Sequence, residues 1–172
     1  LFVYSQLSFD KFHEKKDNLY QITCKITEKD GSESNYGIAS MIQGPTFKEE
    51  IPEIEACVRV KERDYIVKKG NETFYEMASW VDDNFFSVFS FPLIEGNPQT
   101  VFSNIHSIVL TEEIAEKYFG KTNAIGKVME LEIDNKFESF VVTGIAKNPP
   151  QNSSIKFKML LSFKYEQEKN FD

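Results

Sequence analysis

Positive charge and long apolar runs are both scarce in this 172-residue sequence. It has 20 Lys and Arg residues against 27 Asp and Glu residues, a formal net charge of -7 and an isoelectric point of about 5.0. A nucleic-acid-binding surface needs clustered cations, and no dense Lys/Arg block occurs, so nucleic acid is excluded as a partner. The same deficit argues against docking on an anionic membrane surface. No stretch reaches the roughly 18 apolar residues that a membrane-spanning helix needs.

Aromatic and aliphatic residues are abundant by contrast. Hydrophobic residues make up 41% of the chain and aromatic residues 14%, with 16 Phe, which is enough for a packed core and excludes intrinsic disorder. The length suits one generous domain or two small ones. At the start, Leu1, Tyr4 and Leu7 recur at helical spacing beside Phe9 and Phe12. This pattern predicts either a buried core helix or the end of a longer helix that begins upstream.

Alternating apolar and polar residues predict strands through the middle of the chain. The clearest run is 20–27, and the turn after it predicts a hairpin into 33–39. The apolar face of 20–27 consists of Tyr20, Ile22, Cys24 and Ile26. Further strands are expected at 54–61, 65–68, 74–81, 107–110, 129–133, 140–145 and 155–163, and short helices at 46–50 and in a turn capped by Asp82. The Gly70-Asn71 turn predicts a hairpin of 65–68 with 74–81, and the Asp134-Asn135 turn predicts a hairpin of 129–133 with 140–145.

The strongest helix signal runs from Thr111 to Gly120. Thr111 is a good N-cap, carboxylates follow it in the first turn, and Gly120 is a suitable C-terminal stop. The stripe expected to be buried consists of Ile114, Ala115, Tyr118 and Phe119. Short helices and mixed strands in this order predict an α+β fold without internal repeats.

Residues with catalytic or ligand-binding chemistry are present but not suitably arranged. Neither His13 nor His106 has a second ligand at metal-binding spacing. No G-x-S-x-G elbow and no Gly-rich phosphate-binding motif occurs. Acid pairs such as Asp82-Asp83, or Glu130 with Glu132, are interpreted as a capped turn and a solvated strand face. We therefore expect no catalytic, cofactor-binding or metal-binding residue, and no enzyme activity.

The two cysteines are expected to be free thiols. Cys24 falls on the apolar face of its predicted strand, and Cys57 falls on the polar face of another. Side chains on opposite faces of a sheet cannot reach the Cβ separation that a disulfide requires. Cys24 is expected to be buried.

An aromatic cluster occupies residues 80–91. Its members are Trp80, Phe85, Phe86, Phe89 and Phe91. Packing in a core is the first interpretation. The alternative is that four of them, Phe85, Phe86, Phe89 and Phe91, line an exposed patch that contacts a partner.

Several motifs, taken in order, resemble MacB-type ABC transporter permeases. The run from Asp82 to Gly96 is similar to the family signature D-x-x-F-F-x-x-F-x-x-x-L-x-x-G. The segments 7–22, 108–120, 124–127 and 141–157 resemble further family elements in the same order, so that the resemblance spans nearly the whole chain.

This resemblance implies a periplasmic core domain inserted between the first two transmembrane helices of a permease. On this basis residues 1–13 are a helical extension of the preceding transmembrane helix. Residues 14–62 and 154–172 form a porter-like α/β subdomain, and 63–153 a mainly β, sabre-like insert. The sequence ends at Asp172, where such domains usually continue through another strand, so the porter-like part is expected to be incomplete.

The function implied is mechanical. A cytoplasmic ABC ATPase drives the membrane helices, and this non-catalytic domain relays their movement to cargo export or signalling outside the inner membrane. The implied assembly is a dimer of permeases, with a periplasmic protein as a further partner. Two other functions stay open: a free-standing extracytoplasmic module that binds protein or lipid, and a carboxylate-dependent hydrolase.

Overall fold

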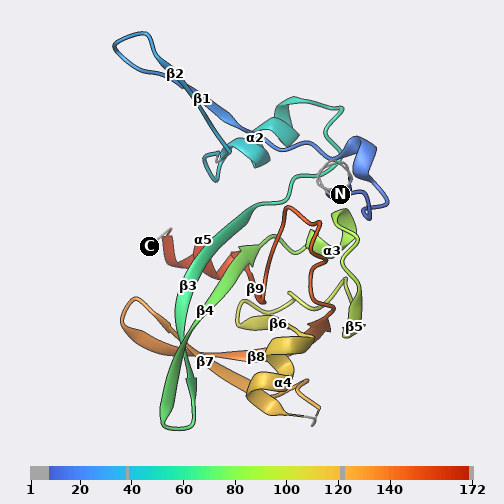
Figure 1. Ribbon diagram of the computed structural model, residues 1–172, viewed down its shortest axis with the longest axis vertical. Coiled ribbons are helices and arrows are strands. Elements are labelled where there is room, and N and C mark those ends of the chain that lie inside the picture. The colour runs from blue at the N-terminus through green and yellow to red at the C-terminus, as the bar shows by residue number, and fades with distance from the viewer. Residues whose placement is uncertain (1–7, 38, 121–122, 171–172) are drawn as a thin grey trace.

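The computed structural model describes residues 8–37, 39–120 and 123–170 (Figure 1). Most of the helix expected over 1–13 lies outside these residues. Residues 8–13 form turns instead of a helix, and Asp10 takes a left-handed φ of 55°. A right-handed helix needs a negative φ at every residue, so this conformation interrupts any helical run at Asp10.

Mixed helices and strands confirm the α+β class. In chain order they are η1 (Lys16–Asn18), β1 (Cys24–Thr27), β2 (Glu33–Tyr36), α2 (Gln43–Glu50), β3 (Val60–Lys69), β4 (Glu72–Val81), α3 (Phe85–Val88), β5 (Leu93–Glu95), β6 (Ser107–Thr111), α4 (Glu112–Phe119), β7 (Val128–Ile133), β8 (Lys136–Ala146), β9 (Met159–Ser162) and α5 (Phe163–Asn170).

Six strands form a sheet that closes on itself, which we call the closed sheet. The strand order is β5-β8-β6-β9-β4-β3-β7, and β7 also pairs with β8, so that β5 alone stands outside the closed set. The β3–β4 and β7–β8 hairpins confirm two predictions from the sequence. The second turns at Asp134 and Asn135, which both have positive φ, as a two-residue hairpin turn requires.

Four strands of the closed sheet, β4, β6, β8 and β9, supply buried residues to two cores, because successive side chains point to opposite faces. Trp80 belongs to the larger core, and its neighbour Val81 belongs to the smaller one. The larger core includes Leu110, Leu161, Ile114 of α4 and Tyr165 of α5. The smaller core consists of Val81, Phe85, Phe91, Val101, Phe102, Val109, Ala146, Phe157 and Leu160.

The helix predicted after Thr111 is confirmed as α4. The Thr111 hydroxyl accepts the N–H of Ile114 at 3.4 Å, and Gly120 ends the helix with φ 66°. Ile114 is buried, as expected for the apolar stripe. The helix therefore forms where local capping and burial agree.

The strand expected over 155–163 is only partly correct. β9 covers Met159–Ser162, and α5 begins at Phe163. β9 lies between β4 and β6, and all four of its residues are buried, including the polar residue Ser162. The Tyr165 ring stacks on Trp80 with centroids 5.0 Å apart, a core contact made by a helix rather than by a longer strand. The strand expected over 54–61 is correct only for its last two residues, because β3 begins at Val60.

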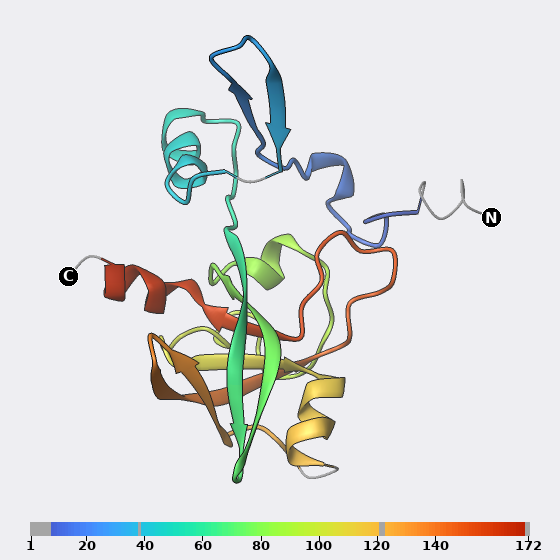
Figure 2. The same cartoon turned by 60° about the vertical axis from the view of Figure 1, so that its left-hand side comes forward.

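The N-terminal module, which we define as β1, β2 and α2, stands apart from the closed sheet (Figure 2). β1 and β2 form their own two-stranded sheet. The strand predicted over 20–27 forms only at Cys24–Thr27. On its apolar face Tyr20 is 87% exposed and Ile26 46%, whereas Ile22 and Cys24 are half-buried, because the hairpin projects away from both hydrophobic cores.

The closed sheet combines strands from both sides of the predicted domain boundaries. β3 begins at Val60, before the boundary at residue 62, and β9 lies in the segment 154–172. The division into porter-like and sabre-like parts stays a prediction about domain organisation.

Candidate functional site

The segment Asp82–Phe91 connects β4 to β5 and contains α3. It contains most of the run that resembles the family signature. Its side chains and backbone contact three parts of the chain that are far apart in sequence: residues 13–15, residues 57–59 and the region where β9 meets α5. We treat this segment and its contacts as the candidate functional site.

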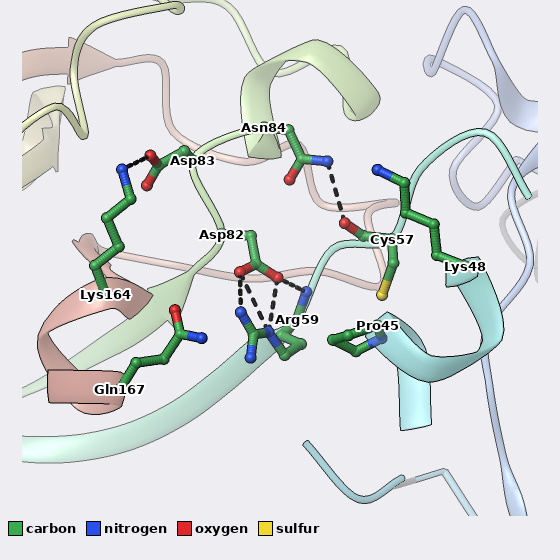
Figure 3. Close-up of a pocket in the computed structure, with 9 residues that line it drawn as sticks. All are labelled: Pro45, Lys48, Cys57, Arg59, Asp82, Asp83, Asn84, Lys164 and Gln167. Carbon is green, nitrogen blue, oxygen red and sulfur yellow. Dashed lines mark hydrogen bonds and ion pairs between the residues drawn. The ribbon is translucent and has the colours of Figure 1, made fainter. Parts of the chain in front are cut away.

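Asp82 binds Arg59 through three donors (Figure 3). The Arg59 backbone N–H donates to Oδ2 at 2.7 Å, Nε donates to the same oxygen at 3.0 Å, and Nη2 donates to Oδ1 at 2.5 Å. The Arg59 guanidinium also lies 4.0 Å from the centre of the Phe163 ring in α5. Both side chains of the pair are mostly buried, so solvent and salt screen the interaction weakly. The expectation that Asp82 caps a helix is wrong: α3 has Asn84 at its N-cap, without a side-chain bond.

The next two residues extend these contacts. Asp83 is ion-paired with Lys164 of α5 and accepts a 3.4 Å hydrogen bond from the Ser162 hydroxyl. The Asn84 side-chain amide donates to the carbonyl of Cys57 at 3.1 Å. The residues after β4 therefore hold both the chain that enters β3 and the start of α5.

An open pocket of about 310 Å³ lies beside these contacts (Figure 3). It is lined by Pro45, Lys48, Cys57, Arg59, Asp82, Asp83, Asn84, Lys164 and Gln167. Each of its two carboxylates is paired with a cation, so neither is placed as a general acid or base. The pocket lies where separate segments of the chain meet, and its polar groups bind these segments to one another.

Close packing between α2 and the chain that enters β3 depends on Gly44. A Cβ atom at this position would lie 2.2 Å from the Cys57 sulfur, so only glycine fits without a shift. Burial raises the pKa of the Cys57 thiol, and the charge of Asp82 adds to this effect. Cys24 and Cys57 are both free, as predicted, but Cys24 is half-buried rather than buried.

The four phenylalanines of the predicted partner patch are divided between core and surface. Phe85 and Phe91 are buried, and their rings stack with centroids 5.6 Å apart. Phe86 and Phe89 are half-buried and pack against the same core. A partner contact on this patch stays a prediction, and Phe86 and Phe89 are the two that retain exposed surface.

His13 is one of three residues whose place in this site the sequence did not predict. The residue is 3% exposed, and its ring packs against the rings of Phe12, Phe89 and Phe91. Nδ1 accepts the backbone N–H of Ser90 at 3.0 Å. Burial lowers the pKa of His13, and the nearby charge of Asp10 opposes this effect only in part. No local pattern indicates this placement, since Phe89, Phe91 and the hydrogen-bond donor Ser90 are all more than 70 residues away in sequence.

Arg59 and Lys164 were also not predicted, although a signal for them exists. Two adjacent carboxylates, Asp82 and Asp83, follow an apolar strand whose end was expected to be buried. Carboxylates that approach a core need cationic partners. The sequence does not identify which Lys or Arg residues pair with these two carboxylates.

Hydrogen bonds also attach residues 8–10 to the loop before β9. The Asp10 backbone N–H donates to the Asn152 carbonyl at 2.9 Å, and the Asn152 side-chain amide donates to the Ser8 carbonyl at 2.8 Å. The Ser154 N–H donates to the Asp10 carboxylate at 2.8 Å. The start of the described chain is therefore fixed at two places, this loop and the Asp82–Phe91 segment.

The other candidate residues lie apart from this site. His106 contacts Glu138 at 3.5 Å, and Glu130 pairs with Lys68 at 3.2 Å on β3. Glu132 lies half-exposed on β7. Over residues 8–37, 39–120 and 123–170, no three His, Cys, Asp or Glu side chains gather where a metal ion would bind. Within these same ranges, no helix has the length and apolar character to span a membrane.

Comparison with known proteins identifies the chain as a domain of a transporter permease family. The model of the MacB-like periplasmic core domain matches residues 1–170, and the chain belongs to this family. The resemblance found in the sequence is therefore confirmed. The family is a periplasmic domain, which implies a periplasmic location for this chain. No match is found among curated protein sequences.

Solved structures share the fold. A domain described as part of a permease protein from Porphyromonas gingivalis has a TM-score of 0.69 and 23% identity, with 83% of this chain and 61% of that chain covered. The periplasmic region of MacB from Actinobacillus actinomycetemcomitans has a TM-score of 0.53 and 16% identity, covering 75% and 59%. The extracellular domain of the transporter YknZ from Gram-positive bacteria gives 0.56 and 14%, covering 86% and 68%. The chain thus spans about three fifths of the first two structures.

Proposed function

We propose that this chain is the extracytoplasmic part of an ABC transporter permease anchored in the inner membrane. It relays ATP-driven movement of membrane helices to export or signalling on the periplasmic side. A cytoplasmic ABC ATPase supplies the energy, two permeases form the working dimer, and a periplasmic protein is a further partner. Family membership supports the permease assignment.

The observation that carries the mechanical role is the attachment of residues 8–15 to the body of the domain. Asp10 is bonded to the loop at Asn152, and His13 and Glu14 are bonded to Ser90. A displacement of the chain before Ser8 therefore pulls on two distant parts of the fold. Closely packed proteins deform little, so such a displacement moves the body as a unit instead of stretching it locally.

A non-catalytic role agrees with the occupation of the acidic groups at the site. Asp82 and Asp83 are bound to Arg59 and Lys164, so both carboxylates are engaged in ion pairs within the chain. These ion pairs hold segments of the chain together.

The test uses the full-length parent protein in its assembly with the ATPase. Spin labels are placed at Lys136, an exposed residue at the start of β8, in a background where Cys24, Cys57 and every other cysteine of the parent protein are replaced by serine. We expect the distance between the two labels of the dimer to change between nucleotide-free and vanadate-trapped states. A control with an inactive ATPase should show no change.

Unchanged distances during active ATP hydrolysis would contradict the relay. Fractionation of the same cells distinguishes the alternative of a free-standing binding module. The full-length protein is expected in the membrane fraction, with this domain accessible to protease from the periplasmic side. Recovery of the whole protein as a soluble periplasmic species would favour the free-standing module.

A further inference from the structure

The Asp82–Phe91 segment contacts the three parts of the chain that join the closed sheet to the rest of the domain. The first is the start of the described chain, at His13 to Lys15. The second is the stretch between α2 and β3, at Cys57 and Arg59. The third is the junction of β9 and α5, at Ser162 and Lys164.

The contacts divide between the two ends of the segment. The first end, Asp82 to Asn84, binds Arg59, Cys57 and Lys164 through charges and one amide. The second end, Ser87 to Phe91, binds the start of the chain. The Lys15 ammonium donates to the Ser87 carbonyl at 3.0 Å, and the Glu14 N–H donates to the Ser90 hydroxyl at 2.9 Å.

The middle of the segment joins these two ends rigidly. The Phe85 N–H donates to the Asp82 carbonyl at 3.0 Å, and the Phe89 N–H donates to the Phe85 carbonyl at 2.9 Å. The Phe85 ring is fully buried and contacts Phe89 and Phe91 at centroid distances of 5.1 and 5.6 Å. A one-turn helix fixed by a buried ring transmits a shift at one end to the other, because it has no room to deform between them.

We infer that Asp82–Phe91 is a coupling segment, which makes the start of the chain, the entry to β3 and the start of α5 open and close as one cooperative unit. Asp82 and Ser90 act as positioning residues at its two ends. The mechanical use of this unit rests on the proposed function, but the cooperativity itself is a property of the chain. Cooperative units of this kind are detected by native-state hydrogen exchange.

Three backbone amides report on the unit: Arg59, which donates to Asp82; Glu14, which donates to the Ser90 hydroxyl; and Ser90, which donates to His13. If the contacts were independent of one another, loss of the ion pair in Asp82→Asn would accelerate hydrogen exchange at the Arg59 amide alone. Coupling predicts that exchange at Glu14 and Ser90 also rises, by about tenfold. Since coupling is reciprocal, Ser90→Ala should accelerate Arg59 by a similar factor.

Glu130→Gln is the matched control. It neutralises a carboxylate that is ion-paired with Lys68 on the far part of the closed sheet, and it should leave all three amides unchanged. Faster exchange at Arg59 in Asp82→Asn, with Glu14 and Ser90 unchanged, would overturn the inference. If Asp82→Asn fails to fold, hydrogen exchange at the Arg59 amide in Ser90→Ala tests the inference by itself. Faster exchange there would support the coupling, and unchanged exchange would overturn it.

The exchange result and the spin-label result are independent. Coupled exchange with no nucleotide-dependent change in distance would refute the proposed function and leave the coupling segment intact. Uncoupled exchange with a clear distance change would refute the coupling segment and leave the proposed function intact.

Discussion

The indole N–H of Trp80 donates a 2.5 Å hydrogen bond to the hydroxyl of Tyr65 inside the larger core. The two residues lie on the adjacent strands β4 and β3, and their rings meet edge to face at 6.2 Å. Both are buried, so water does not replace this bond when it is lost. A buried donor without a partner destabilises the fold more than an average hydrogen bond stabilises it.

Tyr65→Phe should therefore lower the free energy of unfolding by about 1–3 kcal/mol. The measurement is urea-induced unfolding followed by the fluorescence of Trp80, which is the one tryptophan of the sequence. Tyr75→Phe is the control, since Tyr75 is 79% exposed, and it should change stability by less than about 0.5 kcal/mol. Equal effects of the two substitutions would show that the buried bond contributes nothing specific.

Glu76 should make stability depend on pH in the acid range. Glu76 is 2% exposed, and its carboxylate is ion-paired with Lys117 of α4 and with Lys158, the latter at 3.0 Å. Burial by itself raises the pKa of Glu76, but the hydrogen bonds and charges of the two lysines outweigh this and hold the pKa below its ordinary value of 4.5. A lowered pKa in the folded state means that the stabilisation is fully present above pH 4.5 and is lost as the pH falls through the folded value.

The measurement for Glu76 compares wild type with Glu76→Gln. At pH 7 the variant should be less stable by about 1–3 kcal/mol, and the difference should shrink as the pH falls below 4.5. Glu130→Gln, in an exposed pair, should cost at most about 1 kcal/mol at any pH. A Glu76→Gln difference that is constant from pH 7 to pH 3 would refute this assignment.

His13 should also make the free energy of unfolding depend on pH, here near neutral pH, and stability should again decrease as the pH falls. Burial lowers its pKa in the folded state below the ordinary value of 6.5, and protonation would also remove the acceptor used by the Ser90 N–H. Its contribution is therefore present above pH 6.5 and decreases as the pH falls through the folded pKa. In unfolding measured between pH 8 and pH 5.5, wild type should lose more stability than His13→Gln, whose amide oxygen can still accept from Ser90. Parallel curves for the two proteins would exclude His13 as the titrating group.

Thr111 should contribute to α4 through its hydroxyl rather than its shape. Thr111→Val keeps the branched side chain but removes the acceptor of the Ile114 N–H, and it should cost about 0.5–2 kcal/mol. Thr111→Ser keeps the acceptor and should retain most of the stability. Chemical unfolding of both variants measures the difference, and a serine variant no better than valine would contradict the capping role.

The thiols give a direct chemical test. Titration of the denatured protein without reductant should find two free thiols, Cys24 and Cys57. In the native protein Cys57 should react slowly with a thiol reagent at pH 7, because burial raises its pKa and lowers the thiolate fraction. The Cys57→Ser variant identifies its share of the reaction. Detection of no free thiol in the denatured protein would mean that a disulfide forms.

Elements with strong local signals were predicted well from the sequence. α4 has a cap, acidic first-turn residues and a glycine stop within ten residues, and the β7–β8 hairpin has a two-residue turn flanked by alternating strands. The family resemblance was also read correctly, because it rests on several motifs in order. Errors occurred where burial depends on distant segments. Ile26 has the alternation of a half-buried strand and is exposed, while the polar residue Ser162 is buried in β9, between β4 and β6.

The sequence by itself determined the α+β class, the positions of the hairpins and α4, and the absence of the known nucleotide and hydrolase motifs, since these depend on residues close together along the chain. Only the tertiary structure decided that His13, Arg59 and Lys164 meet at one short segment. Their partners lie from 23 to 81 positions away along the chain, and such pairings are selected by the packing of the closed sheet and its two cores, which no local pattern records.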